Sequence, residues 1–160
     1  MIGHTRLLTE LSKLVKRTRA DGVSVCAHAK VRRVFRFAYG AIHQDLTQES
    51  VTVTIKVIRE QRIGVASADT LEPASLTRCA KAALAIARHT PPQRALPELP
   101  RAHRISTTQE YARSTPRLSA EACVKSLKHL MQLTQGLGVT LAGSFVTGED
   151  EFAVANSSNV

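Results

Sequence analysis

The chain has 160 residues, 43% of them hydrophobic, and a formal net charge of +9 at pH 7. A chain of this length is expected to form one domain, or one domain with a short appendage, and to bury roughly 70% of its unfolded surface. We find no run near the ~20 apolar residues that cross a bilayer, and no apolar run with a cleavage site at the beginning. We therefore expect no signal peptide, no membrane partner and a cytoplasmic location.

The first half of the sequence predicts one helix followed by strands. Leucine and valine recur every three to four positions in residues 5–19, which indicates an amphipathic helix. Residues 23–66 contain several runs in which β-branched and polar residues alternate, and short connections between these runs favour antiparallel pairing. Within the last run, Gly64 indicates a bulge or the close approach of another backbone.

A second helix and a proline-rich connection follow. The helix is predicted over residues 73–89, where Pro73 suits the first helical position and alanines allow close packing on a sheet. Four of the six prolines lie within residues 91–100. We therefore expect an extended surface connection over residues 90–117.

A third helix is predicted over residues 119–135, with Ser119 as its N-cap. Gly136 and Gly138 are expected to end it. These glycines also suggest a dinucleotide-binding loop, but that loop lies between a strand and a helix in the opposite order. We therefore interpret them as a helix stop.

Two strands are predicted after the third helix. They cover residues 139–146 and 152–155, and the acidic residues 148–151 are expected to form the turn between them. Together the elements predict an α+β fold, with an antiparallel or mixed sheet packed with about three helices.

No catalytic, cofactor-binding or metal-binding residues are identified from the sequence. None of the six histidines is followed by glutamate, and no two lie at the i, i+4 spacing of paired ligands on one helical face. The three cysteines form no CxxC pair, so we expect buried thiols and exclude a zinc ribbon or thioredoxin-type motif.

One segment offers a possible nucleic-acid contact. Arg32, Arg33 and Arg36 alternate with Phe35 and Phe37, and charge beside aromatic rings is typical of surfaces that bind single strands. The same pattern fits a half-buried strand with both phenylalanines inward and Arg32 and Arg36 outward, which we favour. Weak binding without sequence preference remains the alternative function, as a basic module without enzymatic activity.

Several segments together resemble the first domain of the TldD/PmbA metallopeptidase family. Their order and spacing carry the resemblance, which covers residues 5–160, including the proline-rich connection. The segments are residues 53–67, 69–76, 80–87, 138–143 and 154–158.

The resemblance implies an N-terminal domain that serves as scaffold, dimerisation surface and peptide access for a zinc metallopeptidase. Family members carry an HExxxH zinc helix in a later domain, and this sequence contains no such motif. The resemblance therefore implies a chain truncated before its zinc-binding domain and inactive alone. It also implies a homo- or heterodimer with a TldD/PmbA-type chain and an unstructured peptide as substrate. The family bears an older label as modulators of DNA gyrase.

Overall fold

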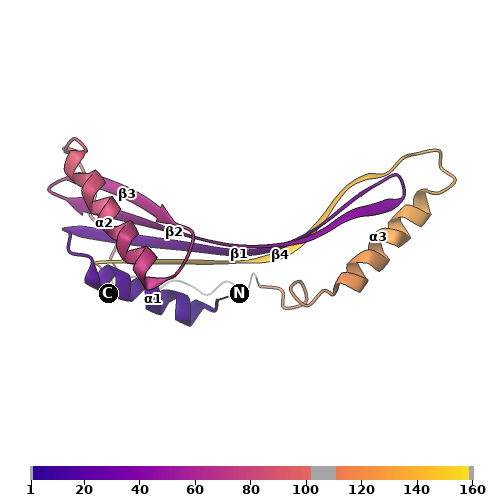
Figure 1. Cartoon of the computed structure of the whole chain (residues 1–160), viewed down its shortest axis with the longest axis horizontal. Coiled ribbons are helices and arrows are strands. Elements are labelled where there is room, and N and C mark those ends of the chain that lie inside the picture. Colours follow the sequence, from indigo (N-terminus) through magenta and orange to yellow (C-terminus); the bar gives the residue numbers. More distant parts are fainter. Residues whose placement is uncertain (1, 102–110, 159–160) are drawn as a thin grey trace. The chain divides into compact units, whose positions relative to one another are not determined.

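The computed structural model describes residues 2–101 and 111–158. In chain order its elements are α1 (His4–Arg17), β1 (Gly22–Ala38), β2 (Ala41–Arg59), β3 (Arg62–Ala68), α2 (Pro73–His89), α3 (Ala120–Thr134) and β4 (Ala142–Asn156) (Figure 1). Helices and strands in separate runs confirm the predicted α+β class. No helix in the described ranges is long and apolar enough to cross a membrane.

The four strands form one sheet in the order β3-β2-β1-β4. Strand β2 pairs with β3 in antiparallel register, from Val53 opposite Ala68 to Arg59 opposite Arg62. Only Tyr39 and Gly40 separate the neighbouring strands β1 and β2, and both have positive φ angles, 49° and 75°. Two successive residues of positive φ are typical of tight hairpin turns, so β1 and β2 are also antiparallel.

Strand β4 lies at the edge of the sheet beside β1 and runs in the opposite direction. The Ser157 N–H donates to the Val23 carbonyl, whereas His28, further along β1, contacts Asp150, which lies earlier in β4. The sheet is therefore antiparallel throughout, which is one of the two arrangements that the sequence predicted.

The prediction of two strands joined by an acidic turn is wrong, because β4 is continuous from Ala142 to Asn156. The acidic side chains that suggested a solvated turn are held by neighbours in the fold. Asp150 lies 2.9 Å from the imidazole of His28, and the Glu151 carboxylate accepts hydrogen bonds from the backbone N–H groups of Ile2 and Gly3 at 3.0 Å.

The chain divides into two compact units. Unit 1 comprises residues 1–29, 50–106 and 150–160, and unit 2 comprises residues 30–49 and 107–149. Each unit has its own hydrophobic core. The sequence predicted one domain over residues 5–160 and gave no sign of this division.

In unit 1, helices α1 and α2 both pack on one face of the sheet. The core combines buried leucines of α1 and alanines of α2 with alternate strand residues Val23, Val25, Ala27, Val53, Ile55 and Val57. Gly64 of β3 is the point of closest approach, because a Cβ atom there would lie 1.9 Å from the Ala83 carbonyl oxygen. The predicted close approach at Gly64 is confirmed, and the alanines of α2 make it possible.

In unit 2, helix α3 packs on Phe35 and Phe37 of β1 through Cys123, Leu127 and Met131. The predicted caps of this helix are confirmed. The Ser119 hydroxyl accepts a hydrogen bond from the Ala122 N–H at 3.2 Å, and Gly136 and Gly138 after the helix have φ angles of 87° and 68°.

The described parts of the proline-rich connection, residues 90–101 and 111–117, contain no helix or strand, as predicted. The remainder of that prediction, residues 102–110, lies outside the described residues. Gln93 anchors the first part to the β2–β3 hairpin, because its N–H donates to the Gln61 carbonyl at 2.8 Å.

Candidate functional site

The donor side chains of the described residues do not fit a zinc ion. A zinc site needs at least three protein ligands at close range, and no group of three or more His, Cys, Asp or Glu side chains in the described ranges could hold a metal. Cys79 and Cys123 are buried in the cores of different units. Burial raises the pKa of the Cys79 thiol, which disfavours the thiolate that binds metal.

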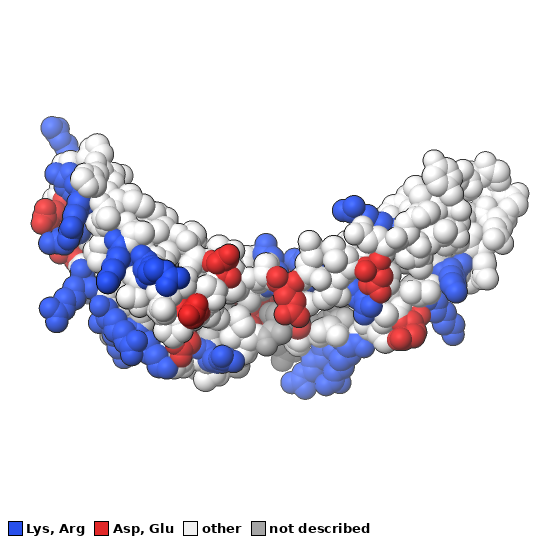
Figure 2. All heavy atoms as spheres, in the orientation of Figure 1, with Lys and Arg blue, Asp and Glu red and all other residues white. Residues whose placement is uncertain are grey.

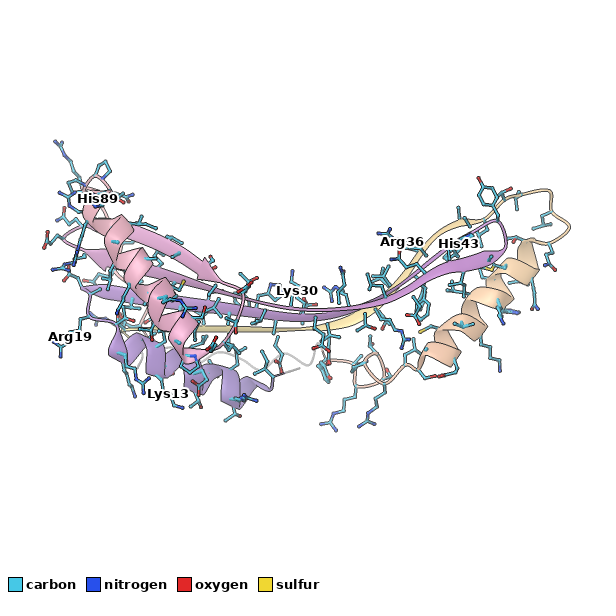
Figure 3. All side chains as sticks on the ribbon, in the orientation of Figure 1. Lys13, Arg19, Lys30, Arg36, His43 and His89 are labelled. Atoms are coloured by element: carbon cyan, nitrogen blue, oxygen red, sulfur yellow. The ribbon has the colours of Figure 1, made fainter. Side chains whose placement is uncertain are left out.

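The three arginines proposed for nucleic-acid contact lie on β1 in unit 2 and differ in environment. Arg33 forms a bidentate ion pair with Asp45 of β2, with N–O distances of 2.9 and 2.7 Å. The guanidinium also lies 5.2 Å from the centre of the Phe35 ring. Arg32 is half-buried, and Arg36 is exposed (Figure 3). Of the three, Arg36 presents its charge most openly.

The ion pair determines the titration of Asp45. Hydrogen bonding from Arg33 lowers the pKa of this carboxyl, and hydrogen bonding to Asp45 raises the pKa of the Arg33 guanidinium. Asp45 is therefore a paired residue of the sheet.

Phe35 and Phe37 do not offer base-stacking surfaces, because both rings are buried against α3. This is the inward orientation that the alternating pattern favoured. The arrangement therefore gives no support to a stacking platform, and nucleic-acid contact by Arg32, Arg33 and Arg36 stays a prediction.

A second candidate site is the face of the β1–β4 pair in unit 1 that is turned away from the helices. It presents Cys26 and His28 of β1 with Phe152 and Val154 of β4. The His28 imidazole contacts the Phe152 ring edge-on, with 6.0 Å between ring centres, and lies 2.9 Å from Asp150. Burial raises the pKa of the Cys26 thiol, so this thiol is not an activated nucleophile.

This face is an exposed apolar surface on an edge strand. Phe152 is 66% and Val154 48% exposed, whereas the intervening Ala153 and the following Ala155 are buried against the helices. An edge strand also has backbone groups available for pairing with another chain. The arrangement is suited to protein association and has no evident chemistry of its own.

Sequence reasoning missed this surface, although one signal was present. In residues 152–155 the larger side chains share one parity and the alanines share the other. Because alanines fit the close approach of helices, the larger residues were the ones to expect on the open face.

Comparison with known proteins gives a family match for part of the chain. Residues 23–87 match the family model described as PmbA/TldA metallopeptidase domain 1. These residues contain β1, β2, β3 and most of α2. No significant match was found among curated proteins.

Solved structures match over nearly the whole chain. TldE from Thermococcus kodakarensis has a TM-score of 0.80 at 17% identity, covering 96% of this chain and 34% of that one. A candidate modulator of DNA gyrase from Bacteroides thetaiotaomicron has a TM-score of 0.80 at 14% identity, covering 98% and 38%. A similarly named protein from Thermotoga maritima has a TM-score of 0.76 at 13% identity, covering 95% and 35%.

These likenesses concern the fold, and this chain spans only about a third of the length of the structures that it matches. The family model confirms the predicted resemblance over residues 23–87, and the solved structures confirm the fold over nearly the whole chain.

Proposed function

We propose that this chain, whose residues 23–87 match the model of PmbA/TldA metallopeptidase domain 1, is a non-catalytic first domain of a cytoplasmic zinc metallopeptidase. It serves as scaffold, association surface and part of the access path for an unstructured peptide. The observation that carries the proposal is the family match, supported by a fold likeness over 95–98% of the chain.

The proposal assigns hydrolysis to residues outside these 160. The described donor side chains do not fit zinc, and a zinc peptidase also needs a general base beside the metal-bound water. The zinc and its ligands would therefore belong to another part of the active protein. This chain would contribute shape and binding surface.

Association with a TldD/PmbA-type chain, as a homodimer or heterodimer, is the second part of the proposal. The open face of the β1–β4 pair supports it, since Phe152 and Val154 expose apolar surface beside an edge-strand backbone. A partner strand on β4 would satisfy that backbone and place its own side chains beside Phe152 and Val154.

Sedimentation of the purified chain over a range of concentrations tests this surface. We expect concentration-dependent self-association that the double variant Phe152→Asp, Val154→Asp abolishes. Val65→Asp is the matched control, because Val65 is 45% exposed on the opposite edge strand β3. A chain that stays monomeric throughout, or equal loss in the control, would contradict the assignment.

Metal analysis tests the assignment of the zinc site separately. After dialysis, the chain is expected to retain much less than one zinc ion per molecule, because the described residues contain no ligand cluster. One tightly bound zinc ion per chain would show that a site exists within these 160 residues.

A further inference from the structure

A groove between α1 and α2 in unit 1 is a candidate interaction site distinct from the open sheet face. Its volume is about 310 Å³. Leu14, Leu76 and Ala80, all buried core residues, form its floor together with the half-buried Leu84. Thr77 and Ala80 are short side chains, so α2 leaves space opposite Leu14. The groove therefore has an apolar floor that is open to solvent.

Basic side chains surround this floor. Lys13, Arg17 and Arg19 line it from α1 and the segment that follows, and Lys81 lines it from α2. Among the described lining residues only Glu10 is acidic, and it is already paired with Lys13 at 2.8 Å. Figure 2 shows lysine and arginine side chains gathered in this part of unit 1, and Figure 3 labels Lys13 and Arg19 beside α1.

Within the described ranges, no acidic side chain neutralises the remaining cations. Arg17, Arg19 and Lys81 are exposed and form no ion pair with another residue in the described ranges. Three uncompensated positive charges around an apolar floor attract a ligand that combines carboxylates with an apolar group.

We propose that the α1–α2 groove binds an acidic amphipathic peptide segment, which places an apolar side chain on the Leu14–Leu76 floor and carboxylates beside Arg17 and Lys81. The volume lies at the lower end of the ~300–1,000 Å³ range of ligand pockets, which suits one or two apolar side chains. A helical segment could lie along the two helices, as amphipathic helices do in other apolar grooves.

Nucleic acid fits this groove less well. The described residues that line it include no aromatic ring on which a base could stack, and a phosphate backbone would leave the apolar floor uncovered. The peptide proposal is also independent of the proposed peptidase role, because it concerns binding alone and needs no hydrolysis.

Fluorescence polarisation with a labelled amphipathic peptide of leucine and glutamate tests the proposal. The double variant Arg17→Glu, Lys81→Glu should bind at least tenfold more weakly than the unmodified chain. The matched control is Lys16→Glu with Arg78→Glu, which makes the same charge change on the exposed surfaces of the same two helices but outside the groove. This control should bind within about twofold of the unmodified chain, because only non-specific attraction is reduced.

A second variant tests the floor without changing charge. Thr77→Trp places a large side chain in the groove from an exposed position, and it should also weaken binding at least tenfold. Thermal unfolding of every variant establishes that each is folded.

Peptide variants complete the test. A peptide with serine in place of leucine and one with lysine in place of glutamate should both bind at least tenfold more weakly. Equal binding of either peptide, equal loss in both charge variants, or no binding by the unmodified chain would overturn the proposal. Competition by oligothymidylate that depends on Arg17 and Lys81 is a further outcome. That result would show that the groove binds phosphate, and it would also overturn the proposal.

Discussion

Unit 1 and unit 2 hold their structures by different means. Among the described residues, unit 1 has two helices on one sheet face and a core of 17 buried residues. The described part of unit 2 has one helix and a core of five buried residues. It adds local polar contacts, including the Arg33–Asp45 ion pair and a hydrogen bond from the Tyr111 hydroxyl to Glu149 at 2.8 Å.

The difference indicates which unit limits stability. Apolar burial is the main driving force for folding, whereas exposed ion pairs contribute little. Regions with few buried apolar contacts open at lower free energy than a large core. We therefore expect unit 2 to open before unit 1, and the following substitutions test this comparison.

The largest expected effect comes from Gly64→Ala in unit 1. The added Cβ atom would lie 1.9 Å from the Ala83 carbonyl oxygen and 2.6 Å from the Ala87 nitrogen, both on the backbone of α2. Because backbone cannot move aside without displacing the helix, we expect a loss of about 3 kcal/mol or more in the free energy of unfolding. Chemical denaturation measures it. Val65→Ala, at an exposed position of the same strand, should reduce the free energy of unfolding far less. Similar reductions in both variants would show that α2 moves aside at little cost.

Matched leucine truncations sharpen the comparison directly. Leu11→Ala in unit 1 and Leu127→Ala in unit 2 each remove a buried side chain, at a cost of about 2–5 kcal/mol. Hydrogen exchange should show loss of protection across the chain for Leu11→Ala. For Leu127→Ala the loss should be confined to unit 2. Loss of unit 1 protection in both variants would mean that the two units unfold together.

A smaller effect is expected at the beginning of α3. Ser119→Ala removes the side-chain acceptor for the Ala122 N–H and should cost about 1 kcal/mol, measured as faster exchange of the first amides of α3. Ser126→Ala is the control, because its hydroxyl bonds only to the Ala122 carbonyl within the helix and alanine favours helix. Equal acceleration in the control would argue against a capping role.

The smallest effect concerns pH. Arg33 lowers the pKa of Asp45 in the folded chain, so this pair stabilises unit 2 fully above the unfolded carboxyl pKa of about 3.9. The contribution is lost as the pH falls through the lower, folded pKa. NMR acid titrations of the unmodified chain and of Asp45→Asn test this. In this pH range, the unit 2 resonances of Asp45→Asn should change less than those of the unmodified chain. Identical titrations would exclude a role for the pair.

The sequence predicted elements whose periodicity reflects burial on one face. Leu7, Leu11 and Leu14 marked α1, and Val53, Ile55 and Val57 marked the core half of β2; all are buried. It did not predict the first half of β2, because residues 43–50 are exposed and carry no alternating apolar signal.

The tertiary surfaces could not be read from the sequence. The continuous course of β4 depends on partners distant in the chain, such as His28 for Asp150. The basic groove exists only because α1 and α2 lie side by side on one sheet face. The residue spacing within either helix does not predict which helix will lie beside it.

The most direct test of the proposed non-catalytic role is a peptidase assay on the purified 160-residue chain. An unstructured fluorogenic peptide is incubated with the chain, with zinc added and with a chelator. We expect no cleavage above the protein-free control in either condition, since the described residues contain no cluster of three or more donor side chains that could hold the metal. Zinc-dependent cleavage that the chelator abolishes, and that follows the chain through purification, would contradict the account.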